Sequence, residues 1–229
     1  GFLTMAFCCV VLKFRFAEGF LLGAVISCTD AASVFSFLRK KKLNLKDGVA
    51  SLLEIESGSN DPTAYMLTVV GISLVNGENL STVPYAIFAQ IVYGVAIGVV
   101  LAVFGIWVLT KTRVVTNGMY TVFILALVLF GMGFSSLVGG NAFLSIYLLG
   151  ILMGNSSIRN KKEIIPFFDG VTGLSQIVIF FLLGLLSFPH KFPYIMGTAI
   201  VIALFILLIA RPLTVLLILK PFHCSLNQC

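Results

Sequence analysis

The chain carries the polar run Leu53-Glu54-Ile55-Glu56-Ser57-Gly58-Ser59-Asn60-Asp61-Pro62 inside an otherwise apolar segment. This run places three carboxylates where the flanking residues favour lipid. An ionisable side chain at membrane depth costs roughly 3 kcal/mol on insertion scales, so its presence indicates ion or proton handling by default. The rest of the chain decides whether the segment crosses a membrane.

Composition indicates an integral membrane protein. Of the 229 residues, 59% are hydrophobic and 10% are charged, and the mean hydropathy is +1.09, whereas about 25% of the residues in a soluble domain are charged. The 15 basic residues outnumber the 9 acidic ones, but the excess lies in short loops between apolar runs, as orientation in a membrane requires. The predicted partner is therefore the lipid bilayer, and no nucleic acid is expected.

Polar clusters divide the sequence into about eight apolar segments, most of them near the roughly 20 residues that a spanning helix needs. The apolar runs are continuous rather than alternating, and lipid offers no partner to unpaired backbone groups, so only helices are plausible. We expect an all-α, multi-span bundle that forms one domain over residues 1–229. The predicted segments are 2–12, 19–38, 48–75, 84–110, 119–138, 142–154, 170–188 and 194–219.

The basic residues are unevenly divided between the two sides of this arrangement. When the loops alternate between sides, eleven Lys and Arg residues fall on one side and three on the other, and Arg211 is left inside a segment. This asymmetry assigns the basic side to the cytoplasm and predicts a multi-pass protein of the cell's plasma (inner) membrane.

Three glycine pairs have the G-x-x-x-G spacing that lets helices approach closely. The spacing is compatible with dimerisation, but close packing between helices of one bundle is the interpretation we favour. The pairs are Gly19 with Gly23, Gly94 with Gly98, and Gly150 with Gly154.

The five cysteines indicate neither a disulfide framework nor a zinc site, since they lack C-x-x-C spacing and only Cys224 has an adjacent histidine. No cofactor is expected, and no metal beyond a transported monovalent cation. The chain begins at Gly1 within an apolar run and without a basic leader, so we interpret it as a piece of a longer protein.

Two aspartates lie near the middle of adjacent segments. Asp30 has hydroxyls around it from Ser27 and Thr29, and a polar centre of this kind often marks a broken helix. Pro62 has no N–H to donate and biases Asp61 away from regular helix. Carboxylate, hydroxyl and carbonyl oxygens together suit a hard monovalent cation. The alternative for Asp61 is a structural, hydrogen-bonded carboxylate.

Arg211 has no acidic neighbour in sequence and must find a partner on another helix. Glu56 and Asp61 are five residues apart, about 140° around a helix and about 7.5 Å along it. One of them can therefore pair with Arg211 while the other binds ions. Glu54 is nearer the cytoplasmic end, where it either lines a vestibule or is structural.

The chain resembles the bacterial monovalent cation/proton antiporters, in particular the cell-volume-regulation type that exchanges potassium for protons. The resemblance covers residues 19 to about 222. It is strongest in Gly23-Ala24-Val25-Ile26-Ser27-Cys28-Thr29-Asp30-Ala31-Ala32-Ser33-Val34-Phe35 and in Glu54-Ile55-Glu56-Ser57-Gly58-Ser59-Asn60-Asp61-Pro62.

The resemblance implies the sodium/proton antiporter fold with a helix broken at Thr29 and Asp30. It implies that Asp61 carries the ion and proton, that Asn60 completes the Asn-Asp pair of electroneutral exchangers, and that Glu56 pairs with Arg211. It also implies a homodimer of the full-length protein, with helices before Gly1 and after the last segment that this chain lacks.

The predicted function is exchange of K⁺ or Na⁺ for H⁺ by alternating access, because a cation and a proton exclude each other on one carboxylate. A passive cation channel and a non-transporting fragment remain alternatives. An enzyme is not expected: an intramembrane aspartyl protease would need a Gly-x-Gly-Asp context that Asn60-Asp61-Pro62 does not supply, and His190 and His223 lie outside the segments, where neither can activate Ser57.

Overall fold

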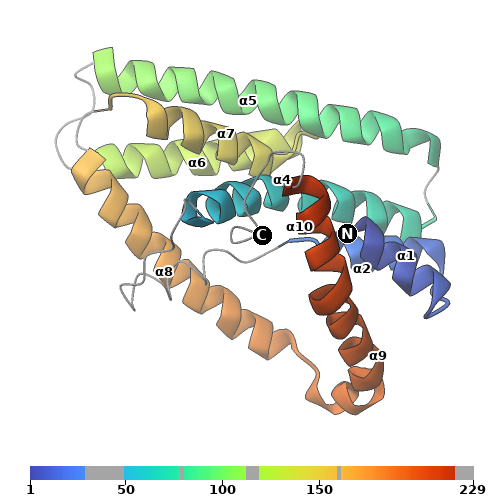
Figure 1. The fold of residues 1–229 in the computed structure, drawn as a ribbon. Coiled ribbons are helices and arrows are strands. Elements are labelled where there is room, and N and C mark those ends of the chain that lie inside the picture. The colour runs from blue at the N-terminus through green and yellow to red at the C-terminus, as the bar shows by residue number, and fades with distance from the viewer. Residues whose placement is uncertain (29–48, 78–79, 112–118, 159–160, 220–229) are drawn as a thin grey trace. The chain divides into compact units, whose positions relative to one another are not determined.

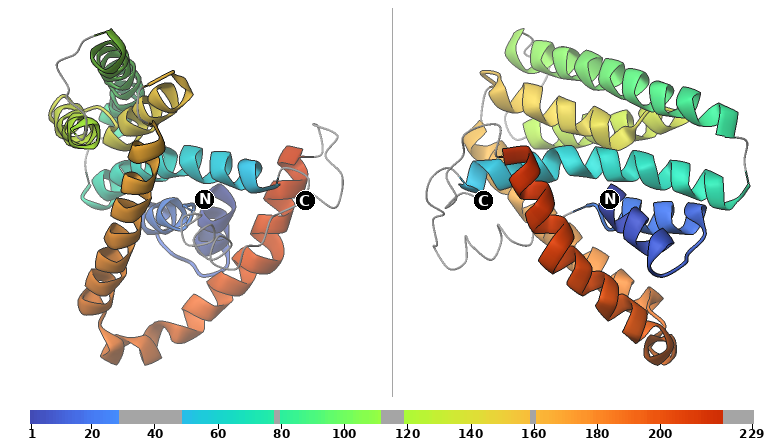
Figure 2. Two further views of the ribbon diagram at one scale, coloured as in Figure 1. Left: turned by 90° about the vertical axis from the view of Figure 1, so that its left-hand side faces the viewer. Right: turned by 45° about the vertical axis from the view of Figure 1, so that its right-hand side comes forward.

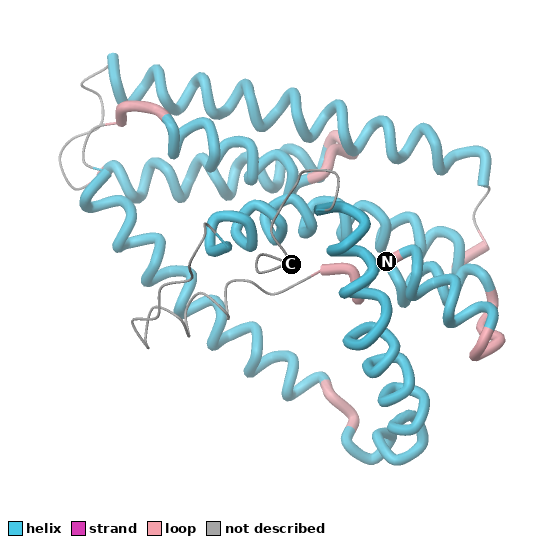
Figure 3. The backbone as a smooth tube through the Cα atoms, in the orientation of Figure 1, coloured by secondary structure: helices cyan, strands magenta, loops and turns pink. Residues whose placement is uncertain are grey.

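The computed structural model describes residues 1–28, 49–77, 80–111, 119–158 and 161–219, and within these ranges every regular element is a helix (Figures 1 and 3). Each of the eight predicted apolar segments contains a described helix, which confirms the all-α fold class. The chain divides into two compact units. One consists of Gly1–Tyr85 with Pro193–Cys229, and the other of Ala86–Phe192.

The first unit contains three helices before the division and the last helical stretch after it. They are α1 (Phe2–Val10), α2 (Phe16–Val25), α4 (Val49–Val75), and α9 (Phe192–Phe205) followed by the π-helical turn Ile206–Ala210 and α10 (Arg211–Leu219). Helix α2 packs against both α1 and α4 (Figure 2). Helix α1 also contacts the π-helical turn, and the rings of Phe7 and Phe205 stack 3.9 Å apart.

Helix α4 runs without interruption through Pro62, so the prediction that the backbone departs from regular helix at Asp61 is wrong. Hydroxyl side chains bond back to the helix on either side of the proline. Ser59 Oγ donates to the Ile55 carbonyl at 2.9 Å, and Thr63 Oγ1 donates to the Ser59 carbonyl at 2.9 Å. The helix therefore stays continuous over 27 residues although Pro62 lacks a backbone N–H. It is about 40 Å long.

The second unit contains α5 (Val83–Lys111), α6 (Tyr120–Leu137), α7 (Ala142–Asn155) and α8 (Lys161–Leu186). Helices α5, α6 and α7 run side by side (Figure 1). Their apolar core includes Ala102, Leu109, Leu127, Leu149 and Met153. Helix α8 begins nine residues before the predicted position 170, because residues 161–169, four of which are charged, are also helical.

The turn between α6 and α7 has residues that suit its backbone conformation. Gly139 has a φ of +80°, the left-handed conformation that glycine adopts without strain. The Gly140 N–H donates to the Ser135 carbonyl at 2.8 Å, and the Gly139 N–H donates to the Ser136 carbonyl at 3.2 Å. These bonds form a Schellman motif that ends α6. Asn141 then caps α7, accepting from the Leu144 N–H at 3.0 Å.

Four described helical stretches are long and apolar enough to cross a membrane: Val83–Lys111, Tyr120–Leu137, Lys161–Leu186 and Pro189–Leu217. Their apolar side chains are widely exposed. In α8, for example, Leu174, Ile177 and Phe181 are 68%, 71% and 65% exposed. Such surfaces are stable in lipid and costly in water. Together with the composition, this identifies a multi-pass membrane protein.

The glycine pairs pack inside the chain in two of the three cases. A Cβ placed on Gly94 or Gly98 would lie 2.9 Å from the Asn141 carbonyl oxygen or 2.6 Å from the Ser145 carbonyl oxygen, both on α7. On Gly23 it would lie 2.7 Å from the Gly1 carbonyl oxygen. Close packing within one bundle is confirmed for these pairs, whereas Gly150 and Gly154 have open space around them.

We expect Gly98→Ala to lower the free energy of unfolding by about 1 to 3 kcal/mol, because the new methyl group must push backbone apart. Gly133→Ala is the matched control. Gly133 is also inside a helix but has nothing within 4 Å, so this change should be neutral or stabilising by up to about 1 kcal/mol. Thermal unfolding of the purified protein in detergent measures both, and equal midpoints would contradict the α5–α7 contact.

We expect Asn141→Ala to cost about 1 kcal/mol or more, because Asn141 is 2% exposed and its side chain caps α7. Asn141→Ser should recover part of this loss, since a serine hydroxyl also caps. The same thermal measurement applies, with the exposed Asn76→Ala as control. A serine variant no more stable than the alanine variant would argue against the cap.

Candidate functional site

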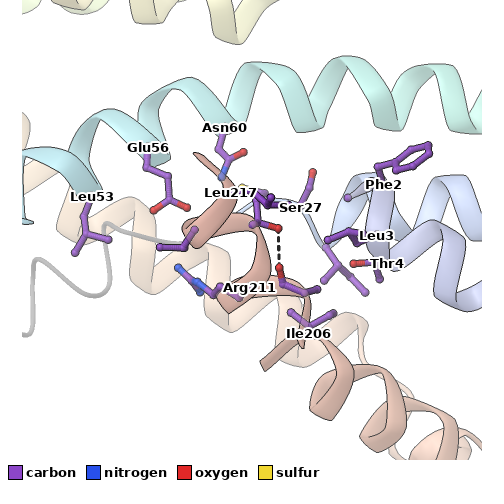
Figure 4. Close-up of a pocket in the computed structure, with 16 residues that line it drawn as sticks. Phe2, Leu3, Thr4, Ser27, Leu53, Glu56, Asn60, Ile206, Arg211 and Leu217 are labelled. Carbon is purple, nitrogen blue, oxygen red and sulfur yellow. Dashed lines mark hydrogen bonds between the residues drawn. The ribbon is translucent and has the colours of Figure 1, made fainter. Parts of the chain in front are cut away.

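The first unit contains a cavity of about 740 Å³ between α4, α10 and the N-terminal helices (Figure 4). Its charged and amide side chains are Glu56 and Asn60 from α4 and Arg211 from α10. Polar side chains also reach it from α1 and from the end of α2. Its remaining walls are mainly apolar. A cavity of this size with a few convergent polar groups has the form of a small-ligand site.

Helix α2 ends at Val25, and the chain turns out of the helix before Cys28. The Ser27 N–H and the Ser27 hydroxyl both donate to the Ala24 carbonyl, at 3.2 Å and 2.6 Å. Ile26, Ser27 and Cys28 then line the cavity. The helix therefore stops shortly before the predicted break, while Thr29 and Asp30 themselves lie outside the described residues.

Helix α4 presents two sides of the polar run to different neighbours. Glu56 and Asn60 are four residues apart, which places them one turn apart on the same side of a helix, and both line the cavity. Asp61 accepts a hydrogen bond at its Oδ1 from Cys28 Sγ, with 2.8 Å between the two atoms. Glu56 and Asp61 thus meet different residues, as their predicted 140° separation requires. The backbone of Glu54 belongs to α4, but its side chain lies outside the described residues.

Arg211 follows a local irregularity of the last helical stretch. Its N–H donates to the Ile206 carbonyl, five residues back, in the π-helical turn Ile206–Ala210. Pro212 has no N–H for the Leu208 carbonyl, which disfavours regular α-helix at this point. One turn further on, Thr214 Oγ1 donates to the Ala210 carbonyl at 2.6 Å, the dashed line in Figure 4.

Glu56 and Arg211 extend toward each other across the cavity in Figure 4. Within the described part of the chain, the structure gives no ion pair between them. The predicted pairing therefore stays a prediction, although both side chains line the same cavity.

The structure brings four predicted residues into one region. Glu56, Asn60 and Arg211 line the cavity, and Asp61 is joined to it through Cys28. Sequence reasoning did not single out Cys28. The available signal was its position immediately before Thr29-Asp30, which places a thiol beside the polar centre of that segment.

Comparison with known proteins gives the family. The sequence model of the transmembrane sodium/hydrogen exchanger family matches residues 1–228. The K⁺/H⁺ antiporter NhaP2 of Shewanella oneidensis is 38% identical over 208 residues, covering 90% of this chain and 36% of that protein. The K⁺/H⁺ antiporter NhaP of Alkalimonas amylolytica is 37% identical over 215 residues, covering 93% and 37%.

A probable Na⁺/H⁺ antiporter of Methanocaldococcus jannaschii is 28% identical over 213 residues, covering 87% of this chain and 49% of that protein. The chain thus spans between about a third and half of the length of these relatives. The family match extends over nearly every residue of the chain. The chain belongs to the transmembrane sodium/hydrogen exchanger family.

Proposed function

We propose that the full-length protein exchanges a monovalent cation, K⁺ or Na⁺, for H⁺ across the plasma (inner) membrane of the cell. The observation that carries this proposal is the Asp61 carboxylate on α4, next to Asn60 and beside a cavity within a chain of the exchanger family. The relatives are named as K⁺/H⁺ and Na⁺/H⁺ antiporters. Both ions are therefore candidate substrates.

Asp61 is the residue on which the exchange depends. A carboxylate in a membrane protein holds either a proton or a cation, because each removes the negative charge that attracts the other. If the protein changes its open face only with one of them bound, the gradient of one ion drives the other. Asn60 cannot ionise, so a one-for-one exchange without net charge follows.

The remaining polar residues support this site. Oxygens from Asn60, Thr29 and Asp30 suit a hard monovalent cation, and Arg211 stabilises the region by pairing with Glu56. Glu54, at the cytoplasmic part of α4, lines the vestibule through which ions enter. The protein acts as a homodimer, with transport completed by helices that precede and follow this chain in the longer protein.

We expect Asp61→Asn to abolish cation-induced proton release, because an amide can neither bind a proton at neutral pH nor neutralise a cation. Proton flux is measured with a pH-sensitive dye in vesicles that hold the full-length protein, with K⁺ and Na⁺ tested separately. Asp169→Asn, a carboxylate variant in α8, is the control and should retain exchange.

The voltage of the same vesicles separates exchange from conduction. With the voltage clamped at zero, exchange moves protons without current, whereas a passive channel moves the cation alone. A correctly inserted Asp61→Asn variant that exchanges at the wild-type rate would show that this carboxylate is structural.

We expect Glu56→Gln and Arg211→Gln to be coupled in stability by about 0.2 to 1 kcal/mol, the range for exposed ion pairs. The double variant should be less destabilised than the sum of the single variants. Unfolding in a denaturing detergent measures the four free energies of this cycle. The pair Glu56→Gln with Lys191→Gln is the control, and equal coupling in both cycles would reject the pairing.

A further inference from the structure

Cys28 contacts the residue on which the proposed exchange depends. Its Sγ lies 2.8 Å from Asp61 Oδ1, although 33 positions separate the two residues in sequence. The contact joins the segment just after α2 to the middle of α4, and α2 itself packs against α4. The thiol is thus held beside the carboxylate by the packing of two helices.

The chemistry of this contact is that of a weak donor on a strong acceptor. A thiol S–H donates weakly, whereas an ionised carboxylate accepts strongly through both oxygens. A sulfur atom is also a poor ligand for Na⁺ or K⁺, which prefer oxygen. The thiol therefore donates to Oδ1 when no cation is present. Once a cation arrives, the sulfur atom does not bind it.

The position of Cys28 allows this exchange of partners. Cys28 follows the last turn of α2, is exposed, and lines the cavity with Asn60. Its backbone lies beyond the helix that ends at Val25, so the side chain can leave Oδ1 without breaking a helical hydrogen bond. A cation that enters the cavity meets Cys28 and Asn60, which contact and adjoin Asp61.

We propose that Cys28 is a positioning residue for Asp61, whose thiol occupies Oδ1 until the transported cation displaces it. This inference rests on the proposed function. The inference goes beyond the proposed function in two respects. It assigns a role to a side chain outside the Asn-Asp pair, and it names Asp61 Oδ1 as the atom for which thiol and cation compete.

The contact itself is tested without transport. N-ethylmaleimide alkylation of Cys28 is followed by mass spectrometry in the full-length protein, with Cys9 on α1 as the internal reference. Asp61→Leu removes the acceptor at similar side-chain size, so Cys28 should react about threefold faster, the factor expected for loss of one weak hydrogen bond. Asp169→Leu should change neither rate. An unchanged Cys28 rate in Asp61→Leu overturns the proposal.

The competition is tested by cation dependence. Cys28→Ala removes the donor, so the cation concentration for half-maximal exchange should fall about threefold while the maximal rate is retained. Cys9→Ala removes a thiol that does not line the cavity and should match the wild type. A half-maximal concentration that is unchanged or higher in Cys28→Ala overturns the proposal, as does a Cys9→Ala variant with the same shift.

The two experiments also separate this proposal from the function on which it rests. If the wild type exchanges no cation, the proposed function fails, and the competition fails with it, even where alkylation reports the contact. If exchange is normal but Cys28 is alkylated at the same rate in the wild type and in Asp61→Leu, only the proposed role of Cys28 is wrong.

Discussion

Every polar group of a spanning helix must find its partner inside the protein, because the bilayer core offers none. Helix α4, which the sequence predicts to cross the membrane, provides partners for its polar groups in two ways. Its hydroxyls are turned back onto its own carbonyls, as at Ser59 and Thr63. Its ionisable groups are instead directed toward neighbouring elements, Asp61 to Cys28 and Glu56 to the cavity that Arg211 also lines. Neighbouring elements of the first unit thus provide a partner for Asp61 and a shared cavity for Glu56.

Most of the fold could be predicted from the sequence, because apolar runs, basic loops and glycine turns depend on residues that are close in sequence. The turn after α6 depends on Gly139 and Asn141, whose preferences do not need tertiary context. The start of α8 was misplaced because the charges among residues 161–169 favoured a loop there, whereas the helix continues through them. Pro62 was expected to disturb α4, but a backbone with one missing N–H remains helical when its surroundings hold it.

The site was only partly readable. Charge alone pointed to Arg211 and the carboxylates of α4, since a charge in a membrane segment requires a partner and the chain contains few candidates. The choice of Glu56 as the partner came from the resemblance to the antiporters. Cys28 carried no such signal, because its relation to Asp61 exists only once α2 lies along α4. The π-helical turn before Arg211 could not be predicted from the sequence either. Pro212 predicts a disturbance of the helix, but not whether the helix kinks, breaks or widens.

The cavity is bordered by the regular helices α1 and α4, by the end of α2 and by the irregular last helical stretch. Helix α4 is continuous at Glu56 and Asn60, whereas α2 has ended before Cys28 and the last helical stretch is π-helical just before Arg211. Regular backbone holds its side chains in fixed relation, and helix ends and π-helical turns are where backbone geometry changes at least cost. A site that must hold a cation and a proton in turn needs a fixed carboxylate and adjustable neighbours. Asp61 belongs to the regular helix, Cys28 follows the end of α2, and Arg211 follows the π-helical turn, which is the division of roles that the proposed exchange requires.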